Sequence, residues 1–192
     1  MGQSIAYFGY GSLVNLATLR TAHLAAHPAR LTGWRRAWLA RPDGVGGQIA
    51  RSDLAFLSAV PDPDCTIEGL VIVDEAENLP ALDRREALYR RLVAPVACDA
   101  GNWHEPRPPT AFLYAADAPR AGNASILRSY LDAVMQGYLH RFGERGLLDF
   151  LATTDGFDLP VIEDRDAPIY PRAVRTSVTE RARFDALVPP RS

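Results

Sequence analysis

The chain has 192 residues, of which 47% are hydrophobic and 23% charged, and its formal net charge is −2. This balance is typical of a folded globular protein rather than a disordered segment. A charge so close to zero gives no general attraction to nucleic acid or to an anionic membrane. All 21 basic residues are Arg, which excludes any mechanism that needs a catalytic Lys.

No stretch of about 18 apolar residues occurs, so we expect no membrane span. The segment Met1–Tyr10 lacks the basic start and long apolar run of a signal peptide, and we expect a cytoplasmic protein. Cys65 and Cys98 are too few for a disulfide framework and have no metal-ligand spacing. His23 and His27 are four residues apart but have no evident third ligand, which favours surface histidines over a metal site.

The first part of the chain favours strands. Ser4–Tyr10 is a short apolar and aromatic run that leads into a glycine-rich turn, which indicates a strand. Asn15 is expected to cap a short helix that continues through Ala22. The patterns of Ala29–Leu39 and Ala55–Val60 predict two further strands.

The middle of the chain continues this pattern. Pro61–Asp64 is expected to turn the chain, so that Ile67–Val73 returns as the second strand of a hairpin. Leu79–Glu86 is expected to form a short helix or turn. Leu88–Val96 and Thr110–Tyr114 then predict two more strands.

Helices dominate the last third. Ser125–Phe142 is the clearest one, because its apolar residues recur at four-residue spacing, and Gly143 is well placed to end it. A second helix is expected over Glu144–Thr153 and a short surface helix over Thr179–Leu187. The Asp- and Pro-rich stretch Asp155–Pro171 is expected to be an irregular excursion.

Strands that come first and a long helix that comes late, without regular alternation, predict an α+β fold with a small mixed β-barrel and flanking helices. We expect a single domain over residues 1–192, in which residues 155–192 form an irregular C-terminal extension.

The strongest local motif is a glycine-rich loop. It consists of Tyr7, Phe8, Gly9, Tyr10, Gly11, Ser12 and Leu13. Two glycines separated by one residue let the backbone turn and direct several N–H groups to one side, where they can bind an anion. The simpler alternative is a strand end that needs positive φ. A dinucleotide-binding fingerprint is excluded, because Val14 stands where its third glycine would be.

Three segments together resemble the γ-glutamylcyclotransferase superfamily, which includes the ChaC-like and AIG2-like proteins. The first is the loop just described. The second is the segment 82–93, in which Leu-Asp leads to Glu86 and then to a Tyr and a strand. The third is Ser129–Leu131 with Gly137 seven residues after Tyr130, which is similar to the late helix of that family.

The resemblance implies a small β-barrel with flanking helices and an enzyme that converts a γ-glutamyl amide into 5-oxoproline and a free amine without metal or organic cofactor. It implies that the loop Tyr7–Leu13 holds the substrate's α-carboxylate and γ-carbonyl, that Glu86 is the acid/base, and that Tyr130 lines the pocket. For Tyr130, which lies on the apolar stripe of its helix, core packing is an equally good interpretation. The expected partner is a small γ-glutamyl molecule, and the protein is expected to be a monomer or a homodimer.

A glutamate exchanges protons with an amine best when its carboxyl group is withdrawn from water and has no cation beside it. Four arginines lie close to Glu86 along the chain: Arg84, Arg85, Arg90 and Arg91. We therefore expect their guanidinium groups to point away from Glu86.

Two other functions stay open. The chain could be a non-catalytic carboxylate-binding module on the same fold, particularly because Ala87 replaces the Gly that usually follows the family's catalytic Glu. A hydrolase that uses Cys65 or Cys98 as its nucleophile is the third possibility.

Overall fold

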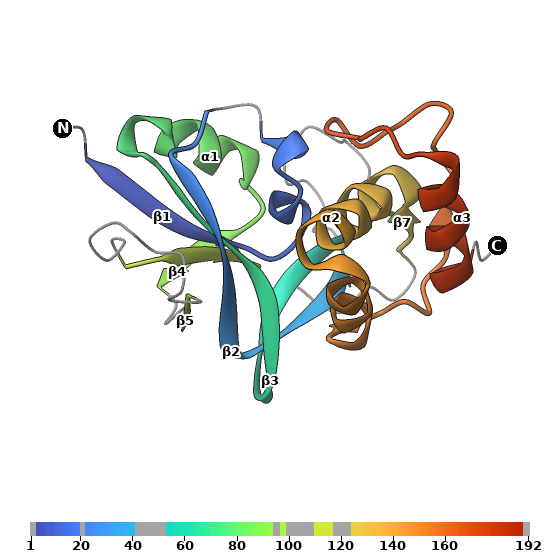
Figure 1. Ribbon diagram of the computed structural model, residues 1–192, viewed down its shortest axis with the longest axis horizontal. Coiled ribbons are helices and arrows are strands. Elements are labelled where there is room, and N and C mark those ends of the chain that lie inside the picture. The colour runs from blue at the N-terminus through green and yellow to red at the C-terminus, as the bar shows by residue number, and fades with distance from the viewer. Residues whose placement is uncertain are drawn as a thin grey trace.

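The computed structural model describes residues 3–19, 22–40, 53–93, 97–98, 110–116 and 124–189. The main sheet and α1 occupy one half of the molecule, and α2 and α3 occupy the other (Figure 1). The main sheet has the order β4-β6-β1-β3-β2-β5, and β8 pairs with β2. Its strands are β1 (Ser4–Gly9), β2 (Ala25–Ala40), β3 (Ala55–Glu75), β4 (Arg90–Val93), β5 (Ala97–Cys98), β6 (Phe112–Ala115) and β8 (Thr154–Asp155). The α+β class and the mixed sheet are thus confirmed, because β1–β6 and β2–β8 are parallel while the other pairs are antiparallel.

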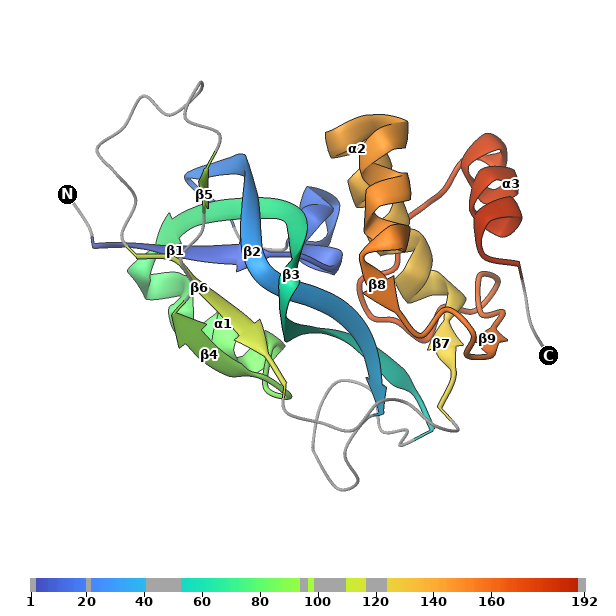
Figure 2. The same cartoon turned by 90° about the horizontal axis from the view of Figure 1, so that it is seen from below.

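The helices include three short 3₁₀ turns: η1 (Ser12–Val14), η2 (Leu16–Thr18) and η3 (Ala76–Asn78). The α-helices are α1 (Leu79–Arg85), α2 (Arg128–Ala152) and α3 (Val178–Leu187). A small parallel pair joins β7 (Ile126–Leu127) to β9 (Val161–Ile162). In both ribbon views α2 lies between the main sheet and α3 (Figures 1 and 2).

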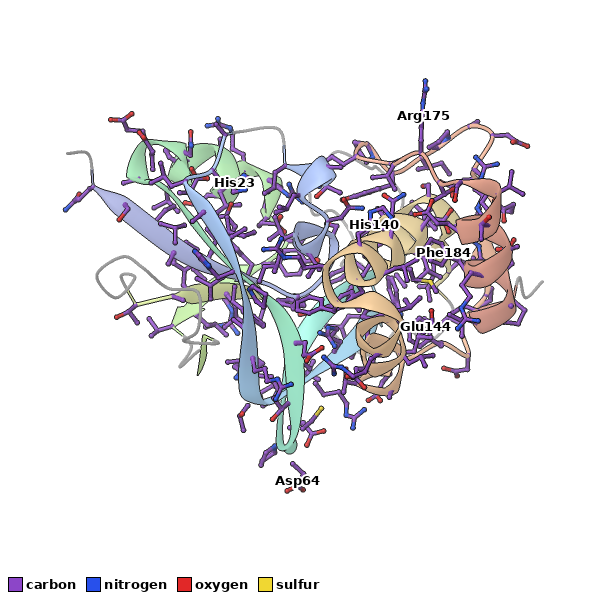
Figure 3. All side chains as sticks on the ribbon, in the orientation of Figure 1. His23, Asp64, His140, Glu144, Arg175 and Phe184 are labelled. Carbon is purple, nitrogen blue, oxygen red and sulfur yellow. The ribbon has the colours of Figure 1, made fainter. Side chains whose placement is uncertain are left out.

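The long ribbon of β2 and β3 corrects one prediction. Pro61–Asp64 does not separate two strands of a hairpin, because β3 runs unbroken from Ala55 to Glu75 and its antiparallel partner along most of that length is β2. The register shifts between Thr32 and Trp34, where Gly33 has φ +84°, so the ribbon bends with both strands intact. Asp64 lies at the tip of this bend (Figure 3). A bulge with glycine at positive φ is a common way to bend a two-stranded ribbon.

The cap at Asn15 is confirmed, but the helix it begins is shorter than predicted. Its side-chain oxygen accepts from the Ala17 amide (3.1 Å), and the 3₁₀ turn ends at Thr18 rather than continuing to Ala22. The side-chain amide of Asn15 donates to the Ala133 carbonyl (2.9 Å) and to Gln136 Oε1 (3.0 Å) of α2. These bonds attach the segment to α2.

The secondary structure around Glu86 agrees in outline with the prediction from the sequence. α1 occupies most of the predicted segment Leu79–Glu86, and Glu86 is the residue that ends it. The strand predicted over Leu88–Val96 is seen as β4, which starts later because residues 86–88 form a turn; residues 94–96 lie outside the described part.

The long helix forms where its periodicity predicts it. It begins at Arg128, later than the predicted Ser125, because Ile126 and Leu127 pair with β9. Gly143 interrupts it with φ +69°. This glycine separates the two helical segments that the sequence predicted as distinct helices.

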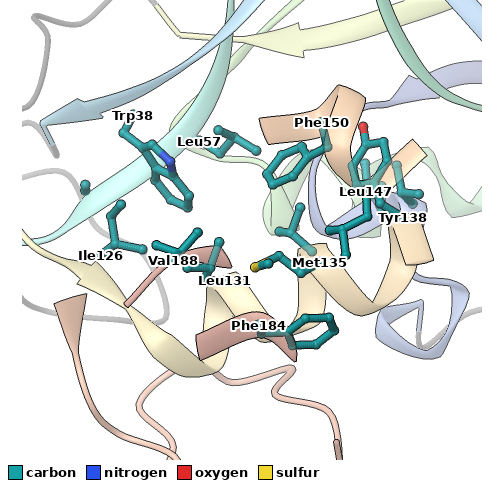
Figure 4. Packing of buried hydrophobic residues seen from close by; sticks show 14 of the residues in the cluster. Trp38, Leu57, Ile126, Leu131, Met135, Tyr138, Leu147, Phe150, Phe184 and Val188 are labelled. Atoms are coloured by element: carbon teal, nitrogen blue, oxygen red, sulfur yellow. The ribbon is translucent and has the colours of Figure 1, made fainter. Parts of the chain in front are cut away.

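The core that holds the site lies between α2, the inner face of the sheet and α3. Figure 4 shows Leu131, Met135 and Phe150 of α2 packed between Leu57 of β3 and Phe184 of α3. These side chains are at most 1% exposed. α3 is fixed at its start by a capping box between Ser177 and Glu180. Among the described residues, no helix is long and apolar enough to cross a membrane.

Close approach of α2 to the N-terminal segment depends on Gly137. A Cβ at this position would lie 2.6 Å from the Asn15 amide nitrogen and 2.8 Å from its Cβ, so a side chain cannot be added without separating the two elements. We predict that Gly137→Ala lowers the free energy of unfolding by about 1–2 kcal/mol, because overpacking outweighs the better helix propensity of Ala. Urea unfolding measures this. The control is Leu148→Ala, on the same helix at a side chain that is 44% exposed, which should change it by less than about 0.5 kcal/mol. Equal effects of the two changes would contradict the prediction.

Candidate active site

A cavity lies where the end of β1 meets α1 and α2. Its empty volume, which includes space open to solvent, is about 310 Å³. Its lining combines one carboxylate, the glycine-rich loop and a set of aromatic side chains: Phe8, Tyr10, Gly11, Ser12, Leu13, Leu57, Glu86, Tyr89, Tyr114 and Tyr130. The structure therefore brings Glu86, Tyr130 and most of the predicted loop to one cavity, although they are far apart in the sequence.

Two members of the predicted loop are not among the lining residues. Tyr7 is 1% exposed and its ring lies beside that of Phe112, with centroids 6.1 Å apart. Gly9 allows the loop to turn, because a Cβ there would lie 2.6 Å from the Cβ of Leu13. Neither glycine of the loop has positive φ, so the simpler interpretation of the motif does not account for them. What Gly9 provides is space for the chain to fold back.

The loop presents backbone amides without internal partners. The first 3₁₀ turn is closed by the Val14 amide, which donates to the Gly11 carbonyl (3.0 Å), and by the Asn15 amide, which donates to the Ser12 carbonyl (3.1 Å). Within the described parts of the chain, the amides of Gly11, Ser12 and Leu13 donate to no other group. All three residues line the cavity. Unpaired N–H groups gathered in one place bind an anionic oxygen.

Glu86 is held by the turn that ends α1. Its amide donates to the Leu82 carbonyl (2.9 Å), and its own carbonyl accepts from the Tyr89 amide (2.9 Å). Its side chain is 14% exposed. No non-glycine residue among those described has positive φ, so Ala87 in place of the family's Gly imposes no backbone strain.

The expectation for the neighbouring arginines is wrong at Arg85. Its Nε donates to Glu86 Oε1 at 2.8 Å, and its side chain is 11% exposed. The same guanidinium donates to the Thr18 carbonyl (3.0 Å), to Thr18 Oγ1 (3.2 Å) and to Ser12 Oγ (3.3 Å). Arg85 turns inward because Ser12 of the loop and Thr18, which follows it, offer these three acceptors beside the carboxylate. Arg91 instead pairs with Asp83 at 3.3 Å.

The four tyrosines of the cavity differ in how their hydroxyl groups are used. Tyr10 donates to the Tyr114 carbonyl, Tyr89 to the Leu57 carbonyl (2.8 Å) and Tyr114 to Asp83 Oδ1 (2.6 Å). The hydroxyl of Tyr130 has no such partner in the described residues. It lies 3.5 Å from where a Cβ of Gly11 would be, so it faces the loop across the cavity.

Contacts of its ring hold Tyr130 in place. It packs edge-on against Trp38 (centroids 5.6 Å apart) and beside Tyr170 (4.8 Å). The sequence left open whether Tyr130 packs in the core or lines the pocket. In the structure its ring packs against the core, and its hydroxyl faces the cavity.

Burial keeps these phenols protonated. It is the largest cause that raises the pKa of Tyr130 and Tyr89 well above the usual value, and the negative charge of Glu86 adds to it in both. Burial likewise raises the pKa of Tyr10 and Tyr114. The hydroxyl of Tyr130 is therefore available as a hydrogen-bond donor at any physiological pH.

Sequence reasoning missed Leu57, Tyr89 and Tyr114 as lining residues. Tyr89 lies in the segment that resembles the family, and Tyr114 ends a predicted strand, but no local pattern indicates which way their rings point. Cys65 is buried and is not part of this lining, whereas the side chain of Cys98 lies outside the described residues. No group of three or more potential metal ligands occurs in the part of the chain that the structure describes.

No protein-family model and no curated protein matches this sequence. Among solved structures, the chain is similar to one named gamma-glutamyl cyclotransferase, with 15% identity and a TM-score of 0.62 over 96% of this chain and 99% of that one. It is also similar to the uncharacterized protein LOC79017 from Homo sapiens, with 17% identity and a TM-score of 0.60 over 95% and 98% of the two chains. A third is YkqA from Bacillus subtilis, with 18% identity and a TM-score of 0.57 over 80% of this chain and 56% of that one.

These similarities show the general class of the fold. The chain shares one α+β arrangement with two of the solved structures over almost their full length. The particular fold is that of the γ-glutamylcyclotransferases, as the sequence motifs predicted. At such low identity the likeness establishes the fold.

The buried phenols make stability depend on alkaline pH. Six of the seven tyrosines have a raised pKa, namely Tyr7, Tyr10, Tyr89, Tyr114, Tyr130 and Tyr138, and burial raises that of Tyr138 to about 12. The unfolded chain releases phenolic protons near pH 10, whereas the folded chain keeps them. The contribution of these tyrosines to the free energy of unfolding is therefore fully present below about pH 10 and is lost as pH rises further.

We predict that tyrosinate absorbance rises in one cooperative step that coincides with the loss of far-ultraviolet circular dichroism. Gradual ionisation near pH 10 with the fold intact would contradict this.

Proposed function

We propose that the protein is a γ-glutamylcyclotransferase, which converts a γ-glutamyl amide into 5-oxoproline and a free amine. The observation that carries the proposal is one cavity lined both by Glu86 and by Gly11, Ser12 and Leu13, whose amides have no partner among the described residues. The fold supports the same assignment.

The reaction needs no nucleophile from the protein. The substrate's α-amino nitrogen attacks its own γ-carbonyl carbon and forms the C–N bond of a five-membered lactam, and the C–N bond to the leaving amine breaks. One proton must leave the attacking nitrogen and one must reach the departing nitrogen. In this proposal Glu86, whose side chain is mostly withdrawn from solvent, carries the proton between them.

The other lining groups fit the remaining tasks. Loop amides directed at a carbonyl that gains negative charge contribute about 3–4 kcal/mol of transition-state stabilisation each in enzymes where this has been measured. A small cavity also favours the folded substrate conformation in which amine and carbonyl are close. Tyr130 completes the wall opposite Gly11 and has a free donor for the substrate.

The test is incubation of the full chain with glutathione, γ-glutamyl dipeptides and γ-glutamylamines, followed by detection of 5-oxoproline. We predict that Glu86→Gln lowers kcat by about a hundredfold or more, because the amide cannot accept the proton. The matched control is Glu77→Gln, the same change at an exposed glutamate just before α1, which should keep the wild-type rate. An unchanged rate in Glu86→Gln would remove this residue from the acid/base role.

Arg85 is expected to position Glu86 relative to the loop. We predict that Arg85→Gln lowers kcat about tenfold, whereas Arg84→Gln, an exposed neighbour on the same helix, changes it less than twofold. In the Glu86→Gln background, Arg85→Gln should cause no further loss, since the group it positions is already absent. A merely structural role would instead lower thermal stability while each folded molecule keeps its full kcat.

A second function has one observation in its favour. The ion pair with Arg85 occupies one carboxylate oxygen of Glu86, which suits a site that only binds. On this alternative the protein is a carboxylate-binding module on the same fold. Tight binding of γ-glutamyl compounds without any 5-oxoproline would support it over the enzyme.

A further inference from the structure

Arg36 is a buried cation directly behind the loop. It lies on β2 and is 0% exposed. Its Nε donates to the Tyr10 carbonyl at 2.9 Å, and its Nη1 donates to Thr153 Oγ1 at 2.6 Å. Its Nη2 donates to the Glu68 carbonyl and to the Tyr138 hydroxyl. The guanidinium also stacks over the rings of Tyr138 and Phe150.

All of these acceptors are neutral. No carboxylate pairs with Arg36 in the described residues; the nearby side chain of Glu68 pairs instead with Arg30 (3.1 Å) and Arg145 (3.0 Å). A fully buried charge is normally paired with an opposite one, because desolvation is costly. The arrangement of Arg36 therefore requires an explanation beyond packing.

Besides the hydrogen bond from Arg36, the Tyr10 carbonyl can accept one from the Tyr138 hydroxyl. The Tyr138 hydroxyl lies 2.8 Å from it and 2.8 Å from the Glu68 carbonyl, and it accepts from Arg36. With a single proton, this hydroxyl donates to one of the two carbonyls at a time. Arg36 and Tyr138 together hold the Tyr10 carbonyl toward the interior.

These hydrogen bonds to the Tyr10 carbonyl fix the direction of the Gly11 N–H. The peptide between Tyr10 and Gly11 is trans, so its C=O and N–H lie in one plane and point in opposite directions. Because the carbonyl points to Arg36 in the interior, the Gly11 N–H points the other way, and Gly11 lines the cavity. A cation on the carbonyl also withdraws electron density from the peptide and makes its N–H a stronger donor.

We propose that Arg36 and Tyr138 are positioning residues, which aim and polarise the Gly11 amide toward an anionic oxygen of the substrate. That oxygen belongs either to the α-carboxylate or to the γ-carbonyl as it gains charge. The bound anion supplies the counter-charge that Arg36 lacks. This inference rests on the proposed function for the identity of the substrate, but the peptide geometry stands without it.

The sequence offers a direct probe, because Tyr10-Gly11 is the only Tyr-Gly pair in the chain. Labelling Tyr with ¹³C at the carbonyl and Gly with ¹⁵N gives a single correlated amide signal, which reports the Tyr10 carbonyl and the Gly11 N–H together. We expect Tyr138→Phe and Arg36→Lys to shift this signal upfield in the ligand-free full chain. The control Tyr170→Phe removes another buried hydroxyl and should leave it unchanged.

Ligand measurements identify the oxygen. If it is the carboxylate, Tyr138→Phe and Arg36→Lys should weaken 5-oxoproline binding about tenfold and raise KM, with binding of the neutral lactam 2-pyrrolidinone unchanged. If it is the developing oxyanion, kcat should fall about tenfold at unchanged KM. A variant that only loosens the core would weaken both ligands equally.

Two results would overturn the proposal: a Tyr10-Gly11 signal in Tyr138→Phe that coincides with the wild type, or a shifted signal with wild-type ligand affinities and kinetics. Tyr138→Phe keeps the ring stacked on Phe150 (centroids 4.7 Å apart) and so carries the test alone if Arg36→Lys does not fold. Failure of the proposed function has a different signature: the wild type would form no 5-oxoproline while the amide signal still responds to both changes.

Discussion

The site depends on the guanidinium of Arg85, which joins α1 to the glycine-rich loop. Glu86 and the loop come from parts of the chain more than 70 residues apart, and Arg85 donates to Glu86, to Ser12 of the loop and twice to Thr18, which follows the loop. A charge-assisted bond to a carboxylate is stronger and more directional than a neutral one. One side chain thus sets how Glu86 and the loop lie relative to each other. Gly137 and Asn15 fix the position of α2 in the site, since their contacts bring this helix, and with it Tyr130, against the loop.

Charge is distributed unevenly around this cavity. Among the described lining residues, Glu86 is the only one with a carboxyl group, and four phenols that stay protonated line the cavity with it. The cations Arg85 and Arg36 lie behind the wall. Each cation acts on a different part of the site: Arg85 on the carboxylate and Arg36 on the peptide of Tyr10 and Gly11. This separation lets one cavity present a negative group and a set of positive amide dipoles without their neutralising each other.

The sequence predicts those features that local patterns determine. The four-residue spacing on α2, the interruption at Gly143 and the loop between β1 and η1 were predicted because each depends on neighbours along the chain. The unbroken β3 was not, since Pro61 and Pro63 usually end a strand; here Pro63 lies in a bulge of β3, where residues 62–65 stand opposite Gly33 alone. The inward turn of Arg85 was missed for the same reason: its acceptors Ser12 and Thr18 are distant in sequence. Arg36 gave no signal either, because its role depends on a carbonyl at the end of another strand.

The layout favours a substrate that is itself a zwitterion at one end. A γ-glutamyl group carries an ammonium and a carboxylate on the same carbon, with a carbonyl two methylenes away. In the proposed complex, the amine lies toward Glu86 and the oxygens lie toward the loop amides, so each charged end meets a group of opposite sign. A simple carboxylic acid would satisfy the amides but leave Glu86 paired only with Arg85. Such an acid would leave Glu86 without a partner from the ligand, so the proposed cyclotransferase function accounts for this residue better than the carboxylate-binding alternative does.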